Sequence, residues 1–171
     1  MAFFPCIYFC ENNSLYFTGK HSNLKNKSRN EVCRIIIERA NNRHFFYVML
    51  LKLFNVCSTK ELRLIVENPF NVQHYLYNNF PYSPTVVDND RRRRGDYYKK
   101  PTQYFFVNCK NTIGASYQEP KKIKTVAFSA KGIKAGICSE ERSMISPDYA
   151  RNFICDFVLG KEQSFAQMNL F

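Results

Sequence analysis

Apolar side chains recur at helical spacing in two parts of this chain. The first part begins at a capping-box pattern, in which the Ser28 hydroxyl and the Glu31 carboxylate bond to free amides of the first turn, and it ends near Asn41-Asn42. Its apolar face comprises Val32, Cys33, Ile36, Ile37 and Ala40. The second part begins at Ser146-Pro147, with proline at its preferred first helical position. Its apolar face comprises Tyr149, Phe153, Phe157 and Val158. The pattern therefore predicts a main helix and a C-terminal helix.

Most of the remaining apolar runs predict strands, because they are short and bounded by turn residues. The run at 45–56 is long and of mixed residue type, and we interpret it as a buried strand. The first two flank an Asn12-Asn13 turn and form an N-terminal hairpin, and another hairpin spans 103–118. The predicted strands are 3–10, 14–18, 45–56, 62–67, 72–82, 103–107, 112–117, 125–128 and 136–138.

Together these elements predict an α+β fold in which one main helix packs on an antiparallel sheet. An N-terminal β-hairpin precedes the helix, and a C-terminal helical extension follows the sheet. A chain of 171 residues can bury a real core as one domain. We expect residues 1–140 to form that domain and residues 141–171 to form the extension, packed on the core.

The charge balance favours a polyanionic partner. Lys and Arg number 25 against 14 Asp and Glu, which gives a formal net charge of +11. Such a balance is typical of proteins that bind RNA, DNA or acidic surfaces, although it also serves solubility alone. No segment approaches the roughly 20 apolar residues of a membrane span, and the apolar start Met1–Cys10 lacks the basic residues of a signal peptide.

The seven cysteines indicate disulfides rather than a metal site. No Cys-x-x-Cys pair occurs, and no histidine cluster follows the closest pair, Cys6 and Cys10. We therefore predict no zinc site and no cofactor. One or two disulfides in a secreted protein fit this pattern, and reduced thiols in a cytosolic protein are the alternative.

The densest basic segment is the candidate binding site. Arg91, Arg92, Arg93 and Arg94 are followed by Tyr97, Tyr98, Lys99 and Lys100, and Lys121, Lys122 and Lys124 come later. Arginine forks bind phosphates bidentately, and tyrosine rings stack on exposed bases. This pattern predicts RNA binding. The alternatives are a solvated loop, or a protease or targeting motif.

The segments that flank this loop resemble the fungal guanyl-specific ribonucleases. In that family a strand ends in Glu-aromatic-Pro, an Arg-led apolar strand follows, and the next strand has the form Leu-Ala-Gly-x-x-x-His. The corresponding stretches here are Asn79-Phe80-Pro81, Tyr104-Phe105-Phe106-Val107-Asn108 and Ile113-Gly114-Ala115-Ser116-Tyr117-Gln118-Glu119. The resemblance implies a ribonuclease-like fold.

The chain also resembles the ribonuclease-like secreted effectors of powdery mildew fungi over about residues 6–138, with an unmatched insertion near 50–70. Those proteins share a Tyr-x-Cys motif near the mature N-terminus, here Tyr8-Phe9-Cys10. They also have a late cysteine that pairs with the first, and Cys138 stands where it would fall. The resemblance therefore implies a Cys10–Cys138 disulfide.

The comparison with the ribonucleases also implies a loss of catalysis. Cleavage through the 2′-hydroxyl needs a base, an acid and a cation. Asn79 stands in place of the family's Glu, Tyr104 in place of its Arg, and Gln118 or Glu119 in place of its His. A rearranged pair of His44 and His74 is the remaining catalytic alternative.

We therefore expect a secreted, monomeric effector with an inactive ribonuclease-like fold. By resemblance it would act in the cytoplasm or nucleus of host plant cells, away from membranes. It would suppress immunity by binding RNA, host proteins or both, and an intracellular host immune receptor could recognise it. The alternatives are an active ribonuclease with a rearranged site and a basic protein-binding adaptor.

Overall fold

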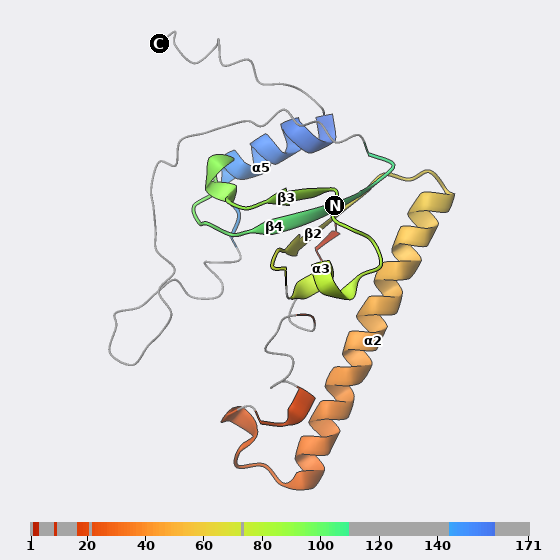
Figure 1. Cartoon of the computed structure of the whole chain (residues 1–171), viewed down its shortest axis with the longest axis vertical. Coiled ribbons are helices and arrows are strands. Elements are labelled where there is room, and N and C mark those ends of the chain that lie inside the picture. Colours follow the sequence, from red (N-terminus) through yellow and green to blue (C-terminus); the bar gives the residue numbers. More distant parts are fainter. Residues whose placement is uncertain are drawn as a thin grey trace. The chain divides into compact units, whose positions relative to one another are not determined.

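The computed structural model describes residues 2–3, 9, 17–20, 22–72, 74–109 and 144–159 (Figure 1). The chain divides into two compact units, each of which is built from segments that are far apart in the sequence. The first unit comprises Met1–Val87 and Gln103–Asn108, and the second comprises Asp88–Thr102 and Cys109–Phe171. The fold is α+β, as predicted, with a main helix and a small sheet.

The main helix, α2 (Arg29–Thr59), is much longer than predicted. Its start is confirmed, because Ser28 and Glu31 form the capping box in both directions. The same bonds from Ser28 lower the pKa of the Glu31 carboxyl. The predicted strand at 45–56 is wrong, since these residues continue the helix. No Gly or Pro interrupts the chain from 29 to 59, and the buried side chains follow helical spacing. The buried side chains of α2 are Leu50, Phe54 and Cys57.

The helix ends without a glycine. Glu61 takes the left-handed conformation that glycine usually supplies, with φ of 54°, and the Leu62 amide bonds to the Cys57 carbonyl at 2.9 Å. The Asn108 side-chain amide then donates to the carbonyls of Cys57 and Leu62, at 2.8 and 3.1 Å. The C-terminus of α2 is therefore fixed partly by a residue from the far end of the sheet.

The sheet has the strand order β1-β2-β4-β3. β2 (Leu64–Pro69) and β4 (Thr102–Val107) confirm two predicted strands, and with β3 (Val86–Asp88) they form an antiparallel sheet. β1 (Ala2–Phe3) runs parallel to β2, with Ala2 opposite Val66. β2 lies between two neighbours, and every residue from Leu64 to Asn68 is buried. The expected alternation of inner and outer residues is therefore lost in this central strand.

The predicted strand at 72–82 is wrong. Residues Tyr75–Asn79 form a short helix, α3, instead. Its first turn depends on Asn68 of β2, whose buried side-chain oxygen accepts the Leu76 amide hydrogen at 3.1 Å. A side chain from β2 therefore takes the place of a local N-cap residue, which a sequence pattern would have revealed.

The N-terminal hairpin is wrong at the positions that the structure describes. Phe9 lies in a helical turn, Phe17 and Thr18 are helical, and Ala2–Phe3 pair with β2. The other residues of that hairpin lie outside the described residues. The same holds for the predicted strands 112–117, 125–128 and 136–138, and for the predicted domain boundary at residue 140.

The C-terminal helix is confirmed as α5 (Pro147–Phe153), and it continues as the π-helix η4 (Ile154–Leu159). Ser146 caps it by accepting the Tyr149 amide hydrogen at 3.0 Å. Tyr149, Phe153 and Phe157 are buried as predicted, but Val158 is 49% exposed.

Candidate functional site

The four arginines lie in an ordered turn of the second unit. Arg91–Arg93 form the 3-10 helix η3, and the Asp90 carboxylate caps it by accepting the Arg92 amide hydrogen at 3.2 Å. Gly95 then takes a φ of 92°, which a residue with a Cβ adopts only with strain, and its amide bonds to the Arg92 carbonyl. The backbone of this arginine turn (residues 91–95) is therefore ordered.

Arg91 lies inside the second unit. Its side chain is 2% exposed and pairs with Asp96, whose side chain is also 2% exposed, at 2.8 Å. The guanidinium carbon lies 4.0 Å from the centre of the Tyr149 ring. A buried cation needs a carboxylate and further contacts to offset its lost hydration. Arg91 is thus a structural side chain that meets the C-terminal helix.

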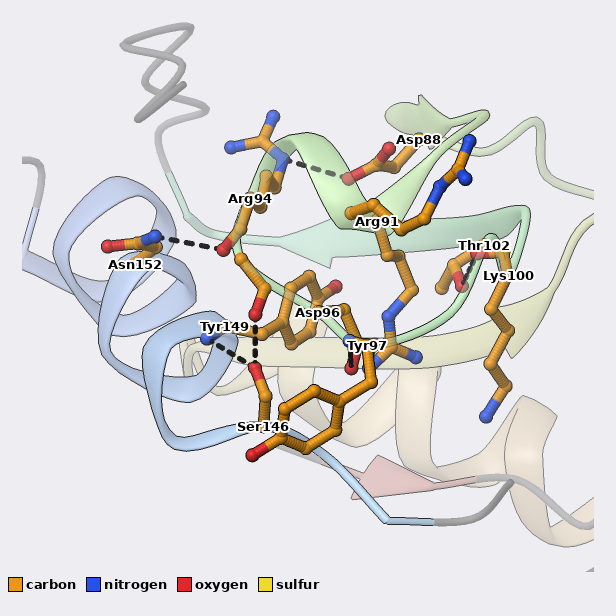
Figure 2. Close-up of polar contacts among 12 residues, drawn as sticks. Asp88, Arg91, Arg94, Asp96, Tyr97, Lys100, Thr102, Ser146, Tyr149 and Asn152 are labelled. Carbon is orange, nitrogen blue, oxygen red and sulfur yellow. Dashed lines mark hydrogen bonds and ion pairs between the residues drawn. The ribbon is translucent and has the colours of Figure 1, made fainter. Parts of the chain in front are cut away.

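Arg94 makes the second junction with that helix. Its Nε donates to Asp88 at 2.9 Å, and its Nη1 donates to Asp156 of η4, whose side chain has no exposed surface. Figure 2 shows the Arg94 carbonyl accepting a hydrogen bond from Asn152 of α5, at 2.8 Å. The guanidinium also lies over the Phe157 ring, 4.8 Å from its centre. Both the side chain and the backbone of Arg94 therefore hold the arginine turn to the helix.

Ser146 completes this junction. Its hydroxyl donates to the Gly95 carbonyl and accepts the Tyr149 amide hydrogen (Figure 2). The residue is 1% exposed. The same side chain that starts α5 therefore also ties the helix to the arginine turn.

Arg92 pairs locally with Asp90. Its Nε donates to Oδ1 of the carboxylate at 2.8 Å, and its Nη2 donates to Oδ2. The bidentate bond lowers the pKa of the Asp90 carboxyl below its ordinary value of 3.8 and raises the pKa of the Arg92 guanidinium. Both side chains are mostly covered, at 23% and 16% exposure.

This pair predicts a specific acid sensitivity. Because the folded pKa of Asp90 is depressed, its contribution is complete above about pH 4 and is lost as the pH falls through the folded pKa. Asp90→Asn should lower stability at pH 7, with a difference from the wild type that shrinks steadily below pH 4. Urea unfolding at several pH values from 2.5 to 7 measures this. A constant difference across that range would contradict the role of the charge.

Three side chains of the predicted binding segment remain at the surface. Arg93 and Lys99 are exposed and Tyr97 is 46% exposed, whereas Tyr98 is 5% exposed and Lys100 is half-buried. Three paired arginines meet four carboxylates, so the cluster supplies no net positive charge to a ligand. Those four carboxylates are Asp88, Asp90, Asp96 and Asp156. Lys121, Lys122 and Lys124 lie outside the described residues.

Two of the positions that correspond to catalytic residues of the ribonucleases are described by the structure, and both are engaged within the fold. Asn79 accepts a hydrogen bond from Arg43 Nη2 at 2.9 Å and donates to the Tyr75 carbonyl at 2.7 Å. Tyr104 is fully buried in β4. Gln118 and Glu119 lie outside the described residues.

Asn79 also lines a pocket of about 420 Å³ in the first unit, here named the α2 pocket. Its described lining is Phe9, Phe17, Ala40, Arg43, His44, Tyr47 and Asn79. The structure thus brings His44 and Asn79 to one pocket. His74, the other member of the rearranged pair, precedes α3 and is not among the described lining residues. Pattern reasoning did not identify Arg43, since a lone arginine in a helix is usually a solvated residue.

Only some of the cysteines used in the disulfide and metal predictions are among the described residues. Cys10 and Cys138 lie outside the described residues. Cys33 is a free, exposed thiol, and Cys57 is a free thiol in the core. In the described part of the chain, no three His, Cys, Asp or Glu side chains gather in a way that could hold a metal ion.

Part of the arginine cluster could have been recognised from the sequence. Asp88, Asp90 and Asp96 flank the arginines within a few positions, and this spacing indicates local ion pairs. Asp156 and Tyr149 carried no such signal, because they meet the turn only through the tertiary fold.

Comparisons with known proteins identify no family and no relatives for this chain. It matches no protein-family model, no curated protein and no solved structure. Within the described residues, no helix has an apolar stretch long enough to cross a membrane.

Proposed function

We propose that this chain is a non-catalytic binding protein that holds RNA through the exposed side chains Arg93, Tyr97 and Lys99. The observation that carries the proposal is the ordered arginine turn, because the ion pairs of its neighbours hold Arg93 at the surface. A cation carried on an ordered turn loses less backbone entropy on binding than one on a flexible loop. An exposed tyrosine ring nearby suits stacking on an unpaired base.

Two observations support the absence of catalysis, one at Asn79 and one at Tyr104. An amide is a poor proton acceptor, and the Asn79 amide is already engaged by Arg43 and by the Tyr75 carbonyl. Tyr104 has no exposed surface from which to reach a substrate. The proposal includes what the effector resemblance implies: secretion by a fungus, action in the host cytoplasm or nucleus, and host proteins, including an immune receptor, as further partners.

A salt-titrated binding assay with fluorescent single-stranded RNA tests the proposal. Arg93→Gln with Lys99→Gln should weaken binding and reduce the slope of log K against log salt by about 1.4, since each phosphate contact contributes about 0.7. Lys60→Gln with Arg63→Gln removes the same charge from exposed positions of the first unit and should leave the slope nearly unchanged.

The same assay separates the alternatives when the RNA is recovered and its length is checked. Intact RNA with a reduced slope in the first double variant supports the proposal. Equal losses of affinity in both double variants would show that the RNA is bound by general charge attraction and not at this site. Cleaved RNA would overturn the non-catalytic assignment, and no binding at low salt would favour a protein-binding adaptor.

A further inference from the structure

The α2 pocket has the size and lining of a small-molecule site. Its volume of about 420 Å³ lies within the roughly 300–1,000 Å³ of typical ligand pockets. Phe9, Phe17 and Tyr47 supply aromatic surface to its walls, and Arg43, His44 and Asn79 supply polar groups. Such a combination of aromatic walls and a few polar groups is typical of sites that orient a small ligand.

Arg43 differs in its partners from the three buried or half-buried arginines of the arginine turn. Arg91, Arg92 and Arg94 each pair with at least one carboxylate. In the part of the chain that the structure describes, no carboxylate pairs with Arg43. Its hydrogen bond goes to the neutral Asn79 amide oxygen, at 2.9 Å.

Within the part of the chain that the structure describes, the surroundings hold the Arg43 guanidinium in place without neutralising its charge. Its central carbon lies 5.1 Å from the centre of the Phe9 ring and 5.7 Å from that of the Phe17 ring. Asn79 is fixed in turn by its bond to the Tyr75 carbonyl. Aromatic faces attract a cation but leave its net charge unchanged. A half-buried positive charge, oriented in advance and lined by aromatic rings, is thus available to an anion.

We propose that the α2 pocket binds a small aromatic carboxylate, with the carboxylate on Arg43 and the ring among Phe9, Phe17 and Tyr47. The planar fork of arginine matches a carboxylate bidentately. A single cation balances the single charge of a carboxylate better than the two charges of a phosphate monoester. The aromatic walls favour a ring over an aliphatic chain, because stacked or edge-on rings contribute binding free energy beyond that of the apolar area they bury.

Ligand-observed NMR with benzoate as the probe tests this inference on the full chain. Benzoate should bind at millimolar concentration, whereas acetate lacks the ring and benzamide lacks the charge, so both should bind at least about tenfold more weakly. Tighter binding of phenyl phosphate than of benzoate would overturn the carboxylate assignment. Equal binding of benzamide would overturn the role of the charge.

Three variants locate the site. Arg43→Gln should weaken benzoate about tenfold or more, and Lys52→Gln, which removes an exposed cation from the same helix, should not. Ala40→Phe should block the pocket from an exposed helical position, where folding tolerates the larger side chain. Unchanged affinity in both Arg43→Gln and Ala40→Phe would overturn the inference. The Arg43→Gln and Ala40→Phe changes lie in the first unit and leave Arg93 and Lys99 in place, so this result is independent of the RNA assay.

Discussion

Replacing Arg94 with methionine should destabilise the second unit by about 3–5 kcal/mol. The change leaves the carboxylates of Asp88 and Asp156 without their shared cation, in side chains that are 9% and 0% exposed. A buried carboxylate that loses its cation has given up its hydration with less attraction to offset that cost. Urea unfolding gives the loss of stability, and hydrogen exchange at the amides of α5 shows where it acts.

Arg93→Met is the matched control, because it removes the same charge from the exposed neighbouring position. Its effect should stay within about 0.5 kcal/mol. Arg94→Lys keeps the charge but cannot reproduce the fork that bonds to two carboxylates, so it should fall between the two. An Arg94→Met protein as stable as Arg93→Met would show that the ion pairs contribute nothing to folding.

Phe54→Ala should cost the first unit about 3–5 kcal/mol. The Phe54 ring is 7% exposed and meets three other rings. Its centre lies 4.9 Å from that of Phe80, 5.6 Å from that of Tyr82 and 6.3 Å from that of Phe105. Truncation removes these contacts and leaves a cavity where α2 meets this aromatic cluster. Chemical unfolding followed by near-UV circular dichroism measures the effect on these rings.

Phe45→Ala provides the comparison on the same helix. Phe45 is 60% exposed, and alanine has the higher helix propensity, so the stability should change by no more than about 0.5 kcal/mol. Phe54→Leu keeps most of the buried volume and should cost less than about 1.5 kcal/mol. Similar losses for Phe45→Ala and Phe54→Ala would place the core elsewhere.

Local signals in the sequence were sufficient for several elements. The Ser28 capping box and the Ser146-Pro147 start both predicted helices that the structure confirms. The apolar runs that became β2 and β4 were recognised from their residue types. In each case the deciding partners lie within a few positions along the chain, where pattern rules apply.

The failures share the opposite property, because a distant residue decides each structure. Asn68 of β2 caps α3, so residues 72–82 gave no sign of a helix. Asn108 bonds to the carbonyls at the end of α2, which has no glycine to mark it. The run at 45–56 was interpreted as a buried strand because it is long, apolar and of mixed residue type, yet the uninterrupted helix before it extends through it.

The candidate site follows the same division. The arginines were visible as a basic run, and the three aspartates beside them were visible as neighbours. The fourth carboxylate, Asp156, lies 62 positions after Arg94, and only the fold reveals that Arg94 is part of the interior. A basic run is therefore a poor guide to surface charge until its acidic partners are known.

The bond between Arg94 and Asp156 also sets an order of events during synthesis. Domains form as the chain leaves the ribosome, from the N-terminus onward. At about 5–20 residues per second, the 62 positions between the two partners take roughly 3–12 seconds to translate. Through that interval Arg91 and Arg94 have no C-terminal helix to contact, so the nascent chain carries more accessible positive charge than the finished protein. Once Tyr149 and Asp156 have left the ribosome, those two arginines can join the interior of the second unit.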